Sequence, residues 1–550
     1  MYKPHLQQRS KIIFMIVFMV SLLFLGLWSL LSPKPTLQAQ ETQPINCRYG
    51  ANNLTAMSSN QWIPTLGAGW WIDFSWEPQG LAVPSASEHY PQIRLRQNRV
   101  GDTFLPTYVV TPALDFSEDG LGTAVINNPG HIWIVGNEPD VDNLAQDSMM
   151  PQMYAQAYYD IYHYIKGLDA TAQIANGGLS MITPGRLQYL DIVWDTYQTL
   201  YGEPMPVDVW NMHLYILSEI RPWDGGYSDG KIALGTDPAI AIKAPYAGQP
   251  PATECAKADV YCRAEHDDIG IFMQQVQYMR QWMKNHGQQN KPLILSEFSQ
   301  LYPFVDYDDP INPTECFLMD EFGQCFTAAR VTQYMQNALN YLSTATDPAL
   351  GYPQDSNRLV QQWNWFSMVT FPGSTGSSSN LLKQNYTDFV YGDPDALTQM
   401  GNAYRNYIAA QPTSVNLVAN SAPHVAGHLV YPATTADATI SVNFSNTGTT
   451  SITDPFEVTF YADAAMTDEI GTAVVDPEVQ GAINGCSWGR KSDAASVVWT
   501  DLAVGTYTYW VKIDSNNDID DETNENDNIA TGQVTIFRLG NRLPIISFTK

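Results

Sequence analysis

The chain has 550 residues, which is enough for two or three domains with a large core. Hydrophobic residues make up 44% of it and charged residues only 15%, a composition that excludes a largely disordered protein. The formal net charge is −28, and because such an acidic surface repels phosphate backbones, we expect no nucleic-acid partner.

The first 40 residues differ in kind from the rest of the chain. Lys3, Arg9 and Lys11 precede an apolar run over 12–31 that is long enough to span a bilayer. A basic flank before an apolar run is typical of an export signal. Residues 1–40 are therefore predicted to be either a cleaved signal peptide or an uncleaved membrane anchor. Both alternatives predict an extracellular or cell-surface protein that meets a membrane only through this segment.

From about residue 60 to 410, short apolar strands alternate with amphipathic helices, as in parallel sheets with helical crossovers. Helices are predicted where apolar residues recur at helical spacing in 154–165, 272–283 and 331–342. The predicted strands are 69–74, 92–96, 132–135, 174–175, 207–212, 293–295 and 360–366, with an eighth expected at 107–110. Eight such strands predict a (β/α)8 TIM barrel over 41–411. The alternative, a doubly wound open sheet, usually carries a G-x-G-x-x-G turn, and the sequence has none.

After about residue 412 the pattern changes to strict alternation of apolar and polar residues. Ile440, Val442 and Phe444 alternate with polar neighbours, and similar runs follow at 456–460 and 507–513. This periodicity predicts a small all-β sandwich of immunoglobulin-like type over 412–540.

The six cysteines are typical of an oxidising compartment. Cys47 and Cys486 are either free or paired with each other across the two domains. A zinc site is the alternative for the remaining four, but they lack the usual two-residue spacing. Two local disulfides are therefore predicted, Cys255 with Cys262 and Cys316 with Cys325.

Two predicted strands end in a glutamate. Glu138 stands in Gly-Asn-Glu-Pro-Asp directly after 132–135, and Glu297 stands in Ser-Glu-Phe directly after 293–295. Because the carboxyl ends of barrel strands meet at one rim, both carboxyls are expected there. Two carboxyls about 5 Å apart are what retaining glycoside hydrolysis requires. Glu77, after the first predicted strand, is the rival carboxyl on the same rim.

These motifs, with the strand ending His213-Leu214-Tyr215, resemble the clan A glycoside hydrolases and most of all family 128, the endo-β-1,3-glucanases. The resemblance implies that Glu138 is the acid/base, that Glu297 is the nucleophile and that Asn137 holds the sugar 2-hydroxyl. It covers the order and spacing of the barrel motifs. The long insertion over 219–265 departs from the family pattern.

Further site residues are expected around the two glutamates. His213 and Tyr215 share one face of a strand and are predicted to hydrogen-bond the nucleophile, although a structural core histidine is the alternative. Arg96 is predicted to support the nucleophile, as an arginine does at this place in the clan. Trp365 is predicted to form a sugar platform, extended by Trp71, with core packing as the alternative.

The acidic turn at 514–527 resembles the adhesion-related CARDB module. Its oxygen-rich side chains, notably Asp514, Asp518 and Asp520, could hold Ca²⁺, and a solvated acidic loop is the alternative. No other metal and no cofactor are expected.

The resulting prediction is an exported, endo-acting retaining hydrolase of β-linked glycan, with β-glucan favoured. Its partner would be a polysaccharide or oligosaccharide substrate, and the C-terminal domain could contact a cell surface or a glycan. The alternative is a catalytically inactive carbohydrate-binding or adhesion protein built on a hydrolase-like barrel.

Overall fold

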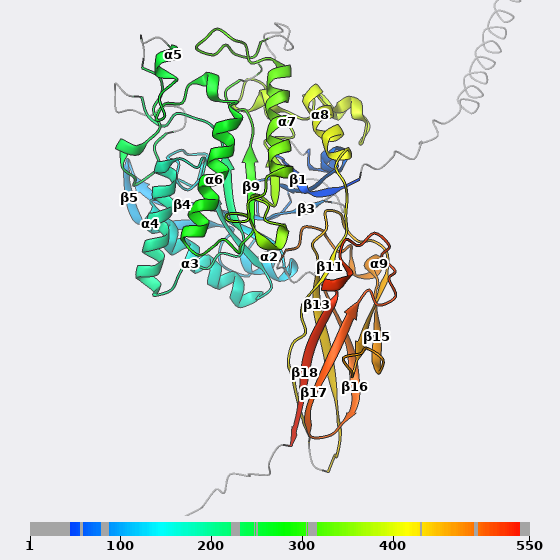
Figure 1. The fold of residues 1–550 in the computed structure, drawn as a ribbon. Helices are drawn as coiled ribbons and strands as arrows, with labels where there is room; N and C mark the ends of the chain where they lie inside the picture. The colour runs from blue at the N-terminus through cyan, green and yellow to red at the C-terminus, as the bar shows by residue number, and fades with distance from the viewer. Residues whose placement is uncertain are drawn as a thin grey trace, which may run out of the picture. The chain divides into compact units, whose positions relative to one another are not determined.

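The computed structural model contains a mixed α/β region followed by an all-β region (Figure 1). The export segment predicted at 1–40 lies outside the described residues. Within the part of the chain that is described, no helix is both long and apolar enough to cross a membrane. The described residues are 44–54, 59–78, 87–221, 231–246, 248, 251–303, 305, 316–429, 432–488 and 493–538.

The α/β region is built on parallel strand pairs. These strands are β1 (Asn46–Asn52), β2 (Ala68–Ile72), β3 (Glu88–His89), β4 (Gln92–Val100), β6 (Ile132–Asn137), β7 (Gln173–Gly178), β8 (Trp210–Leu214), β9 (Leu293–Phe298) and β10 (Gln362–Trp365). One sheet has the order β3-β2-β1-β10-β9-β8, and a second joins β4, β6 and β7. Only Tyr90 and Pro91 separate β3 from β4, and a parallel bridge from Ala175 to Val209 connects β7 with the start of β8. The parallel pairings thus run from β3 through β2, β1, β10, β9 and β8, and continue across the Ala175–Val209 bridge to β7, β6 and β4.

The expected eighth parallel strand at 107–110 was wrong. Those residues belong to β5 (Thr103–Thr111), which pairs antiparallel with β4 across a turn at Gly101. The sequence analysis missed the short parallel strand β3 and the longer β1, which is buried throughout between β2 and β10. Strand β1 carries Asn46, Arg48 and Asn52, so it lacks the apolar run by which buried strands are recognised.

Helices connect the strands, and the longer ones bury an apolar stripe. They are α2 (Leu121–Asn127), α3 (Pro151–Leu168), α4 (Pro184–Tyr201), α5 (Pro251–Glu254), α6 (Ile269–Asn285), α7 (Ala328–Thr344) and α8 (Gln399–Ala409). Short 3-10 helices occupy Asn60–Leu66, Pro238–Ile240, Arg263–Glu265, Pro353–Asp355, Ser377–Ser379, Tyr386–Asp388 and Pro394–Ala396. The three helices predicted from periodicity correspond to α3, α6 and α7.

Side chains on the two faces of the parallel strands enter two different cores. Strand residues such as Trp71, Trp133 and Trp365 pack with the helices in the large core. Their strand neighbours Trp70 and Ile134 pack instead in a small separate cluster formed almost entirely by strand residues. Because side chains alternate along a strand, the parity of a position decides which core it enters.

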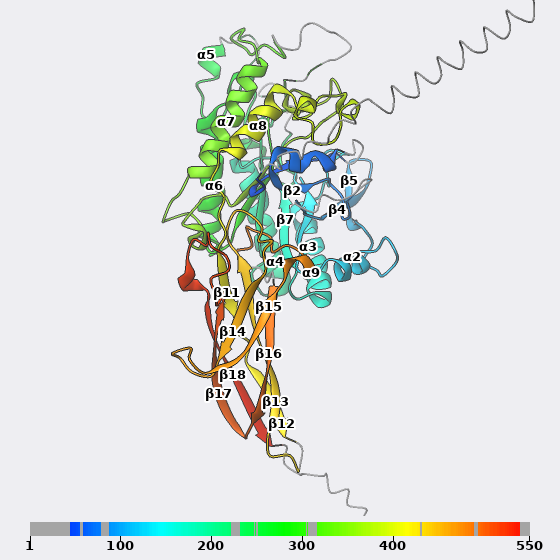
Figure 2. The same ribbon diagram turned by 90° about the vertical axis from the view of Figure 1, so that its right-hand side faces the viewer.

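The all-β region forms a sandwich of two sheets that share one apolar core (Figure 2). One sheet has the order β11-β13-β16 and the other β12-β18-β17-β14-β15. The strands are β11 (Leu417–Ser421), β12 (Val425–Leu429), β13 (Ala436–Asn446), β14 (Phe456–Tyr461), β15 (Glu469–Val475), β16 (Asp493–Leu502), β17 (Gly505–Ile513) and β18 (Ile529–Arg538), with a short helix α9 (Pro477–Gln480) and a 3-10 turn Glu525–Asp527. The structure confirms the predicted alternation of buried and more exposed residues at Ile440, Val442 and Phe444, which are all fully buried.

All six cysteines form disulfides, which indicates an exported or extracellular protein. Cys47 in β1 pairs with Cys486, which precedes β16, and the backbone N–H of Cys47 also donates to the carbonyl of Thr449 at 2.9 Å. The other two pairs are Cys255 with Cys262 and Cys316 with Cys325.

Candidate active site

Three buried titratable side chains meet at the carboxyl ends of the parallel strands. Glu138 directly follows β6, His213 lies in β8 and Glu297 lies in β9, where it pairs in register with His213. One ligand atom from each of the three lies within 4.8 Å of the others. Glu77, the rival carboxyl, is half-buried after β2 and is not in this group. The structure thus brings together the two glutamates that the sequence places 159 residues apart.

His213 bridges the two glutamates. Its Nδ1 lies 3.1 Å from Oε1 of Glu138, and its Nε2 lies 3.5 Å from Oε1 of Glu297. The hydroxyl of Tyr215 donates to the other oxygen of Glu297 at 3.0 Å. Gly178 makes room for this ring, since a Cβ there would lie 2.3 Å from Cδ2 of His213. The site therefore holds Glu138 by a hydrogen bond with His213 of β8 and Glu297 by one from Tyr215, which directly follows β8.

The electrostatics follow from burial and mutual charge. Burial raises the pKa of Glu297 to about 7, assisted by the charge of Glu138 and opposed by the charge of His213 and the Tyr215 hydrogen bond. Burial lowers the pKa of His213, but the charges of the two glutamates outweigh it and the net pKa lies above the ordinary value. Burial also raises the pKa of Tyr215 well above its usual range, so this hydroxyl remains a donor.

The backbone at Glu138 is held in an unusual conformation. Its φ is +43°, in the left-handed region that costs a non-glycine residue roughly 1–2 kcal/mol. The N–H of Asn137 donates to Oδ2 of Asp147 at 2.7 Å, which anchors the turn from one side. The amide of Asn137 accepts from Gln92 at 3.0 Å and donates to Gln146 at 2.6 Å, so it is oriented beside Glu138.

Arg96 is not beside the glutamates, which corrects the sequence expectation. Its side chain is exposed and donates to the backbone carbonyls of Leu144 and Gln146. Arg94, on the same strand face, instead pairs with Asp147 at 2.7 Å, and its charge helps to lower the pKa of Glu297. The reason is that β4 runs on into the exposed hairpin with β5, so the more distal arginine is carried away from the site.

The two tryptophans predicted to bind sugar have no exposed surface. Trp365 is 0% exposed and its Nε1 donates to the carbonyl of Ser379, while the ring of Trp71, also 0% exposed, packs 4.5 Å from that of His89. At both positions the side chain points to the face of the strand that packs in the large core with the helices. Half-buried aromatic rings occur instead just beyond the strand ends, at Phe74 and Phe366, whose centroids are 6.4 Å apart. Their position directly after β2 and β10 was the signal that could have identified them.

The group Glu138, His213 and Glu297 offers oxygen and nitrogen ligands of the kind that divalent metals use. Each imidazole nitrogen, however, faces a different carboxylate, and Tyr215 donates to one of them. His213 thus hydrogen-bonds Glu138 through Nδ1 and lies within ion-pair distance of Glu297 through Nε2.

In the sandwich, Asp514 gathers with Glu522 and Glu525, with ligand atoms within 4.8 Å, and not with the exposed Asp518 and Asp520 named from the sequence. Asp514 accepts the backbone N–H groups of Asp518 and Ile519, so their main chain faces it. The predicted calcium site stays a prediction, and this geometry changes its candidate ligands.

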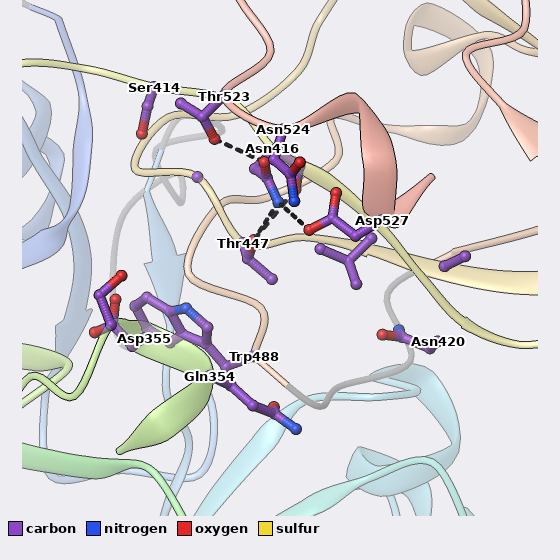
Figure 3. Close-up of a pocket in the computed structure, with 14 residues that line it drawn as sticks. Gln354, Asp355, Ser414, Asn416, Asn420, Thr447, Trp488, Thr523, Asn524 and Asp527 are labelled. Atoms are coloured by element: carbon purple, nitrogen blue, oxygen red, sulfur yellow. Dashed lines mark hydrogen bonds between the residues drawn. The ribbon is translucent and has the colours of Figure 1, made fainter. Parts of the chain in front are cut away.

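A hollow of about 720 Å³ lies away from the glutamates (Figure 3). It is lined by polar sandwich residues, by Trp488 and by residues 354–356. Within it, Asn416 accepts from Thr523 and donates to Thr447 and Asp527, so these polar groups satisfy one another (Figure 3). Contacts of this kind do not indicate a ligand.

Comparison with known proteins matches the sandwich to a family and finds solved structures that are similar to part of the chain. Residues 429–532 match the CARDB family, so the chain contains a CARDB domain. No curated protein sequence matches the chain.

The solved structures that are similar to this chain include the following three. An endo-β-1,3-glucanase of glycoside hydrolase family 128 (subgroup I) from Amycolatopsis mediterranei, in complex with laminaritriose, is 15% identical with a TM-score of 0.37, covering 65% of this chain and 98% of its own. A family 128 (subgroup VII) oligosaccharide-binding protein from Cryptococcus neoformans is 12% identical with a TM-score of 0.36, covering 67% and 96%. The CARDB domain of a Pyrococcus furiosus protein, in complex with di-metal ions, is 20% identical with a TM-score of 0.16, covering 23% and 94%.

Proposed function

We propose that the chain is an exported, retaining, endo-acting glycoside hydrolase that cleaves β-linked glycan, with β-glucan as the favoured substrate. The observation that carries the proposal is the placement of Glu138 and Glu297, both buried, with carboxylate oxygens within 4.8 Å at the ends of parallel strands. Retaining enzymes need about 5–5.5 Å between their carboxyl groups, whereas inverting enzymes need about 6.5–9.5 Å to admit a water molecule.

The mechanism follows from the two carboxyls. The carboxylate of Glu297 attacks the anomeric carbon while the carboxylic acid of Glu138 gives its proton to the leaving glycosidic oxygen. Glu138, now ionised, then takes a proton from water, and the resulting hydroxide displaces Glu297 from the sugar with retention. Tyr215 stabilises the ionised Glu297 through its hydrogen bond. Asn137, beside Glu138, is the candidate for holding the sugar 2-hydroxyl.

In this proposal the catalytic domain is a (β/α)8 barrel over 41–411, followed by an immunoglobulin-like CARDB sandwich over 412–540. Support for the barrel comes from the parallel pairings, which return from β10 to β1 if β3 and β4 count as one interrupted strand. A ring of this kind places Glu138 and Glu297 on one rim.

A glycan-binding protein without activity is the second candidate. It is favoured by the small exposure of the two carboxyls, 9% for Glu138 and 7% for Glu297, and by the burial of both predicted platform tryptophans. A binding protein needs no accessible carboxylate, whereas a hydrolase must open this surface to its substrate.

The test is reducing-sugar release from β-glucans, xylans and mannans by residues 41–550. Glu138→Gln and Glu297→Gln are compared with Glu77→Gln, a matched glutamate after β2. We expect release from one polymer, preserved in Glu77→Gln and lost in the other two variants. The same release after treatment with a chelator would exclude a metal mechanism at this site. Binding of a polymer without release would favour the second candidate.

A further inference from the structure

A charged network is buried directly behind the turn that carries Glu138. Asp140 lies two residues after Glu138, and Asp140, Arg186 and Glu219 are each 0% exposed. Burying three charged groups is costly unless they are paired, so their arrangement needs a physical reason. We define residues 138–142 as the acid/base loop, and residues 219–221 with 231–246, the described first part of the insertion over 219–265, as the inserted segment.

Arg186 is the centre of this network. Its Nη1 donates to Oδ2 of Asp140 at 2.6 Å and its Nε donates to Oε1 of Glu219 at 2.8 Å. Its Nη2 donates to the backbone carbonyl of Lys231. The guanidinium therefore joins the acid/base loop on one side to both described ends of the inserted segment on the other. Arg186 itself is fixed in the first turn of α4, where its N–H is capped by Thr183.

The inserted segment also binds the acid/base loop directly. The N–H of Leu234 donates to the carbonyl of Asp140 at 2.9 Å, and Nζ of Lys231 donates to the carbonyl of Asp142. At its far end, the N–H of Ile242 donates to the second oxygen of Glu219 at 2.8 Å. Glu219 thus closes the inserted segment into a loop and attaches it to Arg186.

The acid/base loop needs an external support because Glu138 has a φ of +43°. A strained backbone persists only where its surroundings over-determine it. In this site the surroundings include the inserted segment, which is the part of the chain that departs from the family pattern. General acid catalysis is sensitive to such support, since the acid must lie within hydrogen-bond reach of the leaving oxygen.

We propose that Arg186 is a positioning residue, which uses Asp140 and Glu219 to fasten the inserted segment to the acid/base loop and so holds Glu138 against the leaving-group oxygen. This inference rests on the proposed function. It gives the insertion a role in the protonation step, while the nucleophile Glu297 is carried by another strand, β9.

The test separates protonation from nucleophilic attack. Arg186→Gln and Arg186→Lys are assayed on the polymer and on a 2,4-dinitrophenyl β-glycoside of the same sugar, whose leaving group departs without a proton. Arg330 provides the control, since it occupies the same third position of α7, has its N–H capped by Thr327 and pairs with two aspartates. Arg330→Gln therefore repeats the substitution in the same local setting, away from Glu138.

We expect Arg186→Gln to lower kcat/KM on the polymer by about 10- to 100-fold and on the dinitrophenyl glycoside by less than about threefold, because kcat/KM reports glycosylation, to which general acid catalysis contributes roughly 10²–10⁴ only where the leaving group needs a proton. Arg186→Lys should recover part of the loss, and Arg330→Gln should change the activity on the two substrates equally.

If Arg186→Gln does not fold, Glu219→Gln, which weakens the same link from the inserted side, should show the same selective loss. Equal losses on both substrates, or none, would overturn the inference alone. A natural chain inactive on both substrates would overturn the proposed function and this inference with it.

Discussion

The α/β region and the sandwich differ in where they place charged side chains. The α/β region buries ionised side chains in pairs at the ends of its strands, as with Arg186 and Asp140 or His213 and Glu138. The sandwich fills its core with alternating apolar residues and gathers its carboxyls at one end, around Asp514. Because burying charge costs free energy, the first pattern marks a candidate site for chemistry, whereas the second keeps charged groups out of the sandwich core.

The sharpest contrast is between Glu297 and Glu522, one in each region, whose pKa values are both raised to about 7 by burial. We expect Glu297→Gln to lower kcat by on the order of 10³-fold or more, because it removes the nucleophile. Glu522→Gln should leave kcat unchanged. Steady-state kinetics on the cleaved polymer measures both, and comparable losses would abolish the distinction between the regions.

The next effect concerns His266, which fastens the loops that follow β8 and β9. It donates to the carbonyl of Ile216 at 2.7 Å and accepts the N–H groups of Leu301 and Tyr302. His266→Ala should destabilise the α/β region by roughly 2–4 kcal/mol, since it leaves several buried groups unpaired. Thermal unfolding measures this, with exposed His428→Ala in the sandwich as the control.

The same histidine predicts a pH dependence. Burial lowers the pKa of His266 to about 4, below its ordinary value near 6.5. Its contribution to stability should therefore be complete above about pH 6.5 and be lost as the pH falls towards 4. His266→Ala should lack this part of the dependence, and an unchanged profile would contradict the assignment.

For the sandwich, the opposite dependence is expected. Burial and the charges of Glu525 and Asp514 raise the pKa of Glu522 to about 7, above its ordinary value. Its favourable contribution is present below about pH 4.5 and is lost as the pH rises through 7. Glu522→Gln should thus raise the unfolding temperature at about pH 8 and change it little at about pH 5. Equal changes at both pH values would contradict this, and a calcium-dependent rise at high pH in the natural chain alone would support the predicted cation site.

The smallest effect is expected for Tyr215→Phe. Glu297 must be ionised to attack, so activity should rise with pH through about 7. Removing the Tyr215 hydroxyl takes away a hydrogen bond that lowers the pKa of Glu297, and should move this acidic limb upward by about one pH unit or less. The pH profile of kcat/KM measures the shift, and a downward shift would contradict it.

Local patterns predicted some parts of the molecule better than others. Helices α3, α6 and α7 followed from apolar spacing because each packs one stripe against the strands. Strand β1 did not follow, because its polar residues are buried by neighbours on both sides that come from distant parts of the chain. The burial of Trp71 and Trp365 did not follow from the sequence. Alternation along a strand does not show which of its two faces packs against the helices.

The sequence by itself determined where carboxyls follow strands, where the rhythm changes from α/β to all-β and which cysteines lie close together. These features are local, since hydrophobic periodicity and turn residues act over a few positions. Only the tertiary structure decided that His213 bridges both glutamates, that Arg94 lies near them and Arg96 does not, and that Arg186 joins the inserted segment to the acid/base loop. Those contacts join residues tens to more than a hundred positions apart, and their geometry depends on strand register and burial, which are properties of the packed fold.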